Sequence, residues 1–145
     1  MERAKKIVID ASVAAKWYVK EESSDKALEL RGDFRARRID LISPRLLLYE
    51  VANGLRYSPE LSSEDIVEAV DSLTAMQIGL IDFDGRQWGN AVKNALTFGI
   101  SLYESAYYTT AEAYSLRLVT SDKRLFKKVK SKNIVLLEEY DYTLL

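Results

Sequence analysis

The stretch KIVIDAS, from Lys6 to Ser12, decides the fold of this chain. Its β-branched run, IVI, is typical of a strand that is buried on both faces of a parallel sheet. The run ends on a carboxylate, Asp10, and a helical pattern, SVAAKWYV, follows at once. Ligands of open α/β sheets bind at the carboxyl ends of the strands, so Asp10 lies where a site is expected. The alternative is that Asp10 or Ser12 only caps the following helix.

The composition indicates one globular domain over residues 1–145. Hydrophobic residues make up 48% of the chain, charged residues 30%, and the net charge is -1. Because this balance gives no global basic field, any contact with nucleic acid must come from local basic patches. The chain begins MERAKKIVID, without a signal-peptide core, and has no apolar run long enough to span a bilayer. We therefore expect a cytoplasmic protein without a membrane partner.

The chain contains neither cysteine nor histidine. The missing cysteine excludes disulfides, thiolate zinc sites and a cysteine nucleophile. The missing histidine excludes imidazole bases and most transition-metal sites. An enzyme of this composition is left with carboxylates and a hard cation, or with Ser, Tyr or Lys chemistry.

Short β-branched runs alternate with helical patterns along the rest of the chain. After the first strand, further strands are predicted at IDLIS (39–43), GLIDF (79–83), LRLVT (116–120) and NIVLLEE (133–139). Two helical patterns separate each strand from the next, and a single one, KRLFKKVKS, precedes the last strand. This order predicts an α/β fold, a three-layer α/β/α sandwich with a short central parallel sheet.

Two of the predicted helices carry a carboxylate with more than one possible role. In RLLLYEVANGLRY, which Pro44 is predicted to open, Glu50 lies beside the apolar arc, with Asn53 one turn on. The segment SLYESAYYTTAEAYS carries so little charge that we expect it to be mostly buried. Its Glu104 forms a capping box with Ser101, lines a site, or does both.

A third helical pattern, opened by Asp84 and ended by Gly99, has apolar residues at the spacing of a core face. These residues are Trp88, Ala91, Val92, Ala95 and Leu96.

The segment LRLVTSD repeats the pattern of the opening stretch. A β-branched strand ends in Thr120, Ser121 and Asp122, and the helix KRLFKKVKS follows, so Asp122 is again a cap or a site residue. This helix carries basic charges and no acid, more than a helix dipole requires. Its cations, and the arginines that precede and include Arg38, are either a solvated surface or a phosphate-binding patch.

Four carboxylates are expected at one edge of the sheet. Two come from strand ends, at Asp10 and Asp122, and two from helices that start near that edge, at Glu50 and Glu104. Converging carboxylates repel each other and raise their pKa values, and hard divalent cations relieve that repulsion. Mg²⁺ or Mn²⁺ takes oxygen ligands, and a site of this kind suits phosphodiester hydrolysis without histidine.

Four segments, VIDASV, LLLYEVANGL, SLYESAYYTTAEAY and LVTSDKRL, carry a resemblance that covers residues 6–137. With them the chain resembles the PIN-domain ribonucleases, and most closely the VapC toxins of toxin–antitoxin pairs. On that resemblance Asp10, Glu50 and Asp122 match acidic metal-binding positions of a catalytic site for Mg²⁺ or Mn²⁺. Glu104 stands where the family usually has Asp, and its longer side chain would require the site to readjust.

The resemblance also implies lining residues, partners and a substrate. Ser12, Asn53 and Thr120 are expected to line the site. Family members are usually homodimers that act on RNA and are inhibited by a VapB-like antitoxin, whose tail fills the acidic groove. Four basic residues are candidates to hold the RNA backbone: Arg38, Lys123, Arg124 and Lys127.

Two other functions stay open at the level of sequence. The same nuclease chemistry serves a housekeeping role in RNA processing equally well. A PIN-like RNA- or protein-binding module with weakened catalysis is the second alternative, and Glu104 is the residue that favours it.

Overall fold

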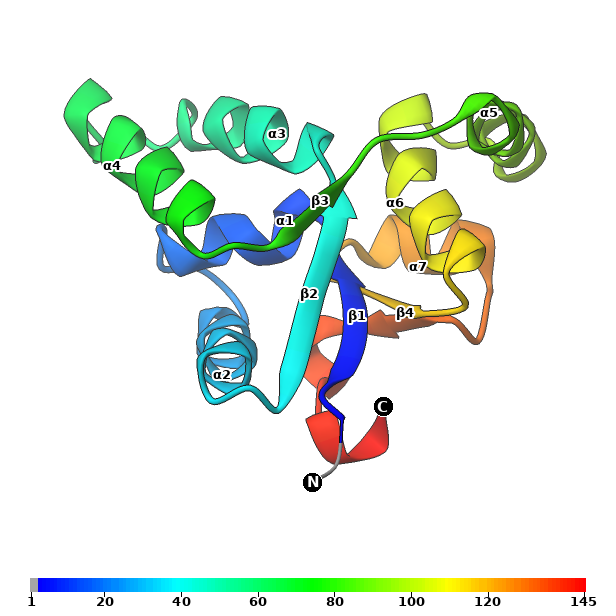
Figure 1. Ribbon diagram of the computed structural model, residues 1–145. Helices are drawn as coiled ribbons and strands as arrows, with labels where there is room; N and C mark the ends of the chain where they lie inside the picture. Colours follow the sequence, from blue (N-terminus) through cyan, green and yellow to red (C-terminus); the bar gives the residue numbers. More distant parts are fainter. Residues whose placement is uncertain (1–2) are drawn as a thin grey trace.

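The computed structural model describes residues 3–145 and has a parallel five-stranded sheet at its centre (Figure 1). The strand order is β3-β2-β1-β4-β5, so β1, the strand of the opening stretch, lies in the middle. The strands are β1 (Lys5–Ile9), β2 (Ile39–Pro44), β3 (Gly79–Ile81), β4 (Arg117–Thr120) and β5 (Ile134–Leu136). The predicted three-layer α/β/α fold is confirmed.

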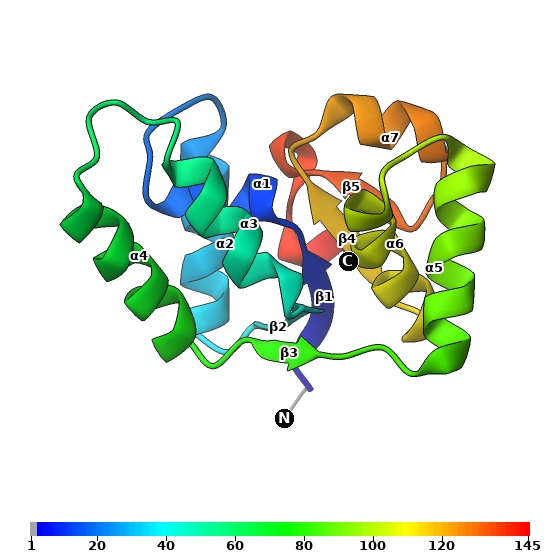
Figure 2. The same ribbon diagram turned by 90° about the horizontal axis from the view of Figure 1, so that it is seen from above.

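Helices cover both faces of the sheet. Seen from above, α1 to α4 lie on one side and α5 to α7 on the other (Figure 2). The first group is α1 (Ala11–Ala14), α2 (Ser24–Arg35), α3 (Leu46–Leu55) and α4 (Ser63–Ala75). The second group is α5 (Gly85–Phe98), α6 (Leu102–Ala113) and α7 (Lys123–Val129). Short 3₁₀ turns are η1 (Ala15–Trp17), η2 (Leu137–Glu139) and η3 (Tyr142–Leu144).

The register of the sheet aligns the ends of β1 and β4. Ile9 pairs with Val119, so Asp10, the first residue after β1, lies beside Thr120, the last residue of β4. Because both strands run in the same direction, α1 and α7 also begin at this carboxyl edge. The sheet therefore delivers two carboxylates and two helix starts to one place.

The core of the sandwich is built on α6, as its low charge predicts. Seven consecutive residues of α6, 105–111, are buried, and the helix contacts β1, β2 and β4. Its buried hydroxyls have partners, since Ser105 Oγ donates to the Ala91 carbonyl (2.6 Å) and Thr110 Oγ1 to the Ala106 carbonyl (2.8 Å). The face of α6 that points at the carboxyl edge is thereby held firmly in place.

The prediction of a core face on α5 is wrong for its larger residues. Ala91 is the buried residue of this helix, whereas Trp88, Val92 and Leu96 are exposed. The reason is that α5 packs on α6 rather than on the sheet, and the small residue at the contact lets the two helices approach. The helical spacing identified an apolar stripe but not which side of the helix the core would occupy.

Pro44 also differs from its prediction. It is the last residue of β2, opposite Ile81 of β3, and α3 begins two residues later at Leu46. No helix between residues 3 and 145 is long and apolar enough to cross a membrane.

Candidate active site

A cavity of about 200 Å³ at the carboxyl edge of the sheet collects the four predicted carboxylates. Asp10 follows β1, Asp122 follows β4, Glu50 lies on α3 and Glu104 on α6. Ala11, Ser12, Tyr107 and Leu125 complete the lining. We call this space the carboxylate cavity.

Asp10 is the most buried of the four acids, with 6% of its surface exposed. Ser12 Oγ donates to its Oδ1 (2.5 Å) and Thr120 Oγ1 to its Oδ2 (2.5 Å). Asp10 also caps α1, because its Oδ1 accepts from the Val13 amide (3.3 Å). Burial raises the pKa of Asp10 to about 6, the nearby Asp122 carboxylate adds to the rise, and the three hydrogen bonds oppose it. Ionised Asp10 is therefore a buried negative charge in the cavity wall, and its desolvation is unfavourable.

Asp122 is both a helix cap and a wall of the cavity. Its Oδ1 accepts from the Leu125 amide (3.0 Å) at the start of α7. Its own amide donates to Thr120 Oγ1 (3.0 Å), and the neighbouring Ser121 amide donates to Ser12 Oγ (2.9 Å). The hydroxyls of Ser12 and Thr120 therefore tie the two acidic turns together. Ser12 lines the cavity, whereas Thr120 is fully buried behind Asp10.

Glu50 is held by a residue that the sequence reasoning missed. The Tyr107 hydroxyl donates to Glu50 Oε1 at 2.6 Å. Burial, and then the Glu50 carboxylate, raise the pKa of Tyr107 far above its usual range, so this phenol stays a hydrogen-bond donor. The signal was its position, three residues after Glu104 and on the same side of α6.

We expect Tyr107→Phe to weaken the binding of added Mn²⁺ about tenfold while the protein stays folded. The substitution keeps the buried ring and removes only the donor that orients Glu50, and partners of this kind contribute about 10- to 100-fold. Calorimetric titration with Mn²⁺ measures the effect. Tyr108→Phe, a buried phenol one residue on, is the control, and equal losses in both variants would contradict an orienting role.

Glu104 has both carboxylate oxygens engaged. Oε1 accepts from the Ser101 amide (2.9 Å), which completes the predicted capping box, and Oε2 accepts from Arg124 Nη1 (2.9 Å). Burial alone would raise the pKa of Glu104, but the Ser101 hydrogen bonds and the Arg124 guanidinium hold it below its ordinary value. Arg124, predicted as an RNA contact, is therefore an internal partner of the fourth carboxylate.

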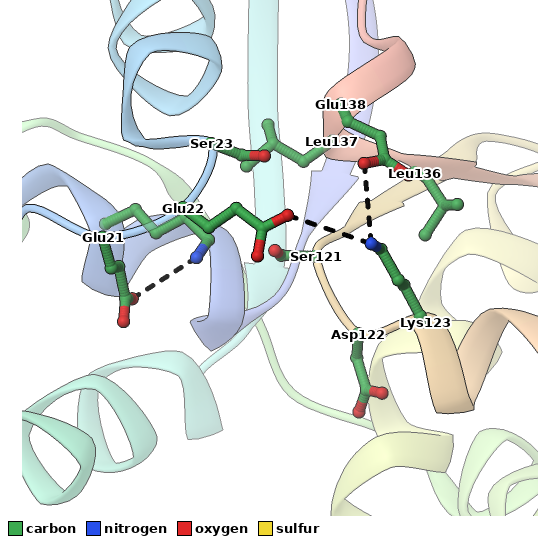
Figure 3. Close-up of a pocket in the computed structure, with 10 residues that line it drawn as sticks. Glu21, Glu22, Ser23, Ser121, Asp122, Lys123, Leu136, Leu137 and Glu138 are labelled. Carbon is green, nitrogen blue, oxygen red and sulfur yellow. Dashed lines mark ion pairs between the residues drawn. The ribbon is translucent and has the colours of Figure 1, made fainter.

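Lys123 lies in a second cavity of about 450 Å³, which shares Asp122 with the first (Figure 3). Its ammonium lies between Glu22 Oε1 (3.9 Å) and Glu138 Oε2 (3.8 Å), and the Asp122 carboxylate points away from it. Ion pairs this long and exposed contribute at most about 1 kcal/mol. Lys123 can therefore exchange these carboxylates for a phosphate at little cost.

The structure does not bring the remaining candidates to the cavity wall. Asn53 is exposed and accepts from Arg56 Nη1 (3.0 Å), and Lys127 is exposed in the last turn of α7. Arg38 precedes β2 and so lies at the opposite, amino edge of the sheet, where Nη1 donates to Asp33 (3.2 Å).

The donors of the carboxylate cavity fit a hard divalent cation in kind. They are carboxylate and hydroxyl oxygens, which suit Mg²⁺ or Mn²⁺. As the side chains lie, no three acids within residues 3–145 stand close enough together to share one ion. To bind a cation, the carboxylates would have to replace their present hydrogen bonds with metal contacts. Glu104 would have to give up the most, because Ser101 and Arg124 occupy both of its oxygens.

The sequence is similar both to a protein-family model and to a known ribonuclease. The family described as PIN domain matches residues 7–132. Ribonuclease VapC3 of Pyrobaculum aerophilum is 32% identical over 133 residues, which cover 85% of this chain and 94% of the relative.

Two solved structures share the fold. A toxin–antitoxin complex from Klebsiella pneumoniae gives a TM-score of 0.68 at 15% identity, covering 92% of this chain and 99% of that one. VapBC2 from Rickettsia felis, bound to a promoter DNA fragment, gives 0.62 at 18% identity, covering 90% and 96%.

Proposed function

Because this chain belongs to the PIN-domain family, we propose that it is a divalent-metal-dependent endoribonuclease that acts in the cytoplasm as the toxin of a toxin–antitoxin pair. The observation that carries the proposal is the convergence of four carboxylates on one cavity in a chain without histidine or cysteine. The 32% identity to a ribonuclease over most of both chains supports RNA as the substrate.

Asp10, Glu50 and Asp122 would hold Mg²⁺ or Mn²⁺, with Glu104 as the fourth ligand once it leaves Arg124. When bound, such a cation polarises the scissile phosphate and favours ionisation of a nearby water. The chain's own residues position these ligands. Ser12 and Thr120 fix the Asp10 carboxylate, Tyr107 fixes Glu50, and Arg124 offers a guanidinium at the rim for a phosphate oxygen.

Mn²⁺-dependent cleavage of RNA by the purified protein tests the proposal. We expect Asp122→Asn to lower the rate at least about a hundredfold, because loss of a ligand costs more than loss of a ligand's hydrogen-bond partner. Asp84→Asn is the matched control, because Asp84 also caps a helix, α5, but lies outside the cavity. Equal activity of Asp122→Asn and wild type would refute the proposed site.

The partner proposed for the cavity is a VapB-like antitoxin. The four acids are balanced there by Arg124 alone among the residues described, so a basic side chain on a partner's tail would complement them. The printed descriptions of the Klebsiella and Rickettsia structures name toxin–antitoxin assemblies, which supports a partner of this kind.

A homodimer is the second proposed assembly, and the apolar stripe of α5 is its proposed surface. Trp88, Val92 and Leu96 follow one another at four-residue spacing and are 50%, 47% and 80% exposed. The stripe adjoins an apolar cavity of about 170 Å³ lined in part by Phe83, Trp88 and Tyr103. Apolar surface of this extent on an outer helix is typical of a protein interface.

We expect Val92→Glu to shift the protein from dimer to monomer, weakening association at least about tenfold, because a charge would be buried against the partner copy. Light scattering after gel filtration measures the mass. Val67→Glu on α4 is the control, since Val67 is a valine on another surface helix and is somewhat more exposed than Val92 (59% against 47%). A monomeric wild type, or a Val92→Glu variant that stays dimeric, would contradict this surface.

A further inference from the structure

A basic pocket of about 510 Å³ lies at the amino edge of the sheet, opposite the carboxylate cavity. It is formed by the start of β1, by the turn between α2 and β2, and by η3 near the C-terminus (Figure 1). Its side chains are those of Arg3, Lys5, Arg37, Arg38, Tyr142 and Thr143. We call it the amino-edge pocket.

Among residues 3–145, the lining of this pocket contains four cations and no acid. Arg38 is partly neutralised from outside by Asp33, and its guanidinium lies over the Tyr142 ring, 5.6 Å from the centroid. The Lys5 ammonium donates to the Tyr142 carbonyl (3.1 Å). Arg3 and Arg37 form no ion pair with any residue from 3 to 145. The pocket thus carries an uncompensated positive charge.

Asp141 is a second acid near the pocket, and its carboxylate accepts hydrogen bonds from within its own turn. It accepts from the Thr143 amide (2.9 Å) and hydroxyl (2.7 Å). These hydrogen bonds, with the more distant Lys26 and Lys5, hold the pKa of Asp141 below its usual range. It therefore stays ionised and offsets only part of the charge.

The backbone presents the two consecutive arginines in a fixed way. Arg37 has φ 62°, a left-handed conformation uncommon for residues other than glycine, asparagine and aspartate. Its amide donates to the Phe34 carbonyl (3.0 Å), and the Arg38 amide to the Asp33 carbonyl (2.9 Å). These two hydrogen bonds form a Schellman motif, which ends α2 and fixes the backbone positions of Arg37 and Arg38 beside the pocket.

The carboxylate cavity by itself offers an RNA chain few cations that are free of carboxylates. The carboxylate cavity is acidic, the whole chain has net charge -1, and Arg124 and Lys123 are engaged with carboxylates. Sequence-independent affinity for RNA comes from phosphates neutralised by lysine and arginine. We propose that the amino-edge pocket binds backbone phosphates of an RNA that extends beyond the carboxylate cavity.

This inference rests on the proposed function, because it makes the pocket a second contact for the same substrate. Five residues of extended chain separate Lys5 from Asp10, so the two sites are about 17 Å apart at about 3.3 Å per residue. A dinucleotide held in the carboxylate cavity would not reach the pocket, so the short oligonucleotide of the test is a dinucleotide. A long or folded RNA would reach it.

The test compares two RNAs and three double variants. Binding of a transfer RNA and of a short single-stranded oligonucleotide is measured by fluorescence anisotropy in EDTA, over a range of salt concentrations. Arg3→Gln/Arg37→Gln removes the two unpaired cations of the pocket. Lys127→Gln/Lys132→Gln removes two cations on and beyond α7, and Arg86→Gln/Lys93→Gln removes two from α5. All three variants lose the same charge.

We expect Arg3→Gln/Arg37→Gln to weaken transfer RNA binding about tenfold and to reduce the salt slope by one to two, and the α5 control to change neither. The oligonucleotide should bind all variants alike. Equal losses in all three variants, or a loss confined to the α7 variant, would overturn the proposal. The proposal would also be wrong if AMP bound at the pocket in a way that depends on Arg3 and Arg37, while RNA affinity did not depend on these two residues.

Cleavage in Mn²⁺ separates this proposal from the nuclease itself. If wild type cleaves both RNAs and Arg3→Gln/Arg37→Gln cleaves both equally well, the pocket plays no part and the nuclease stands. If wild type cleaves neither RNA while transfer RNA binding still depends on Arg3 and Arg37, the nuclease proposal fails and the pocket remains an RNA-binding site.

Discussion

Asp10→Asn is expected to abolish RNA cleavage and, at neutral pH, to make the EDTA-treated protein more stable by up to about 3 kcal/mol. Burial raises the pKa of Asp10 from 3.8 to about 6, so the folded chain resists ionising this carboxylate. Each pKa unit corresponds to about 1.4 kcal/mol. Asparagine keeps the size and can still pair with the hydroxyls of Ser12 and Thr120, but it carries no charge.

The pH dependence gives this prediction its sign. The folded-state pKa is raised, so the cost of charging Asp10 is absent below the unfolded pKa near 4 and complete above about pH 6. The variant should therefore match wild type near pH 4 and melt roughly 10 °C higher at pH 7. Thermal denaturation followed by circular dichroism measures the difference.

Two comparisons complete that experiment. Added Mn²⁺ should stabilise wild type and not Asp10→Asn, because only wild type retains the proposed ligand. Asp84→Asn, which changes an exposed helix cap, should melt like wild type at every pH. A variant less stable than wild type at pH 7 would mean that the hydrogen bonds to Asp10 outweigh the cost of its burial.

The carboxyl edge could be read from the sequence because strand polarity fixes it. A parallel strand followed at once by a helix puts its last residue both at the helix start and at the ligand-binding edge. For Asp10, Asp122 and Glu104, the role of helix cap and the role of site residue are therefore compatible in this fold. Each of these acids caps a helix, and each lines the carboxylate cavity.

The same polarity argument would have placed Arg38 correctly. It precedes β2, so it belongs at the amino edge, whereas Lys123 follows β4 and belongs at the carboxyl edge. Other features depend on how helices pack, which local patterns do not encode. The contact of Tyr107 with Glu50 joins α6 to α3 across 57 positions, and the pairing of α5 with α6 decides which of its apolar residues are exposed.

Arg124→Gln is expected to bind Mn²⁺ about tenfold more tightly than wild type. The guanidinium occupies Glu104 Oε2 at 2.9 Å and places a positive charge where a divalent cation would approach. Without the guanidinium, Glu104 Oε2 is free to bind the cation and the charge repulsion toward Mn²⁺ is lost. A gain of about 1.4 kcal/mol in binding free energy corresponds to a tenfold tighter affinity. Calorimetric titration measures the affinity. Lys123→Gln is the control, since it removes the neighbouring cation, whose partners Glu22 and Glu138 lie outside the carboxylate cavity.

Glu104→Asp tests the same competition from the other side. Aspartate can keep the capping box, as Asp65 does with Ser62 in α4, but it is too short to hold both Ser101 and Arg124 as Glu104 does. We expect tighter Mn²⁺ binding than in wild type and faster cleavage. Arg124→Gln should instead bind RNA more weakly, because the guanidinium would also be lost to the phosphate. If neither variant gains affinity and wild type binds no cation, Glu104 is only a helix cap, and the binding-module function is favoured over the nuclease.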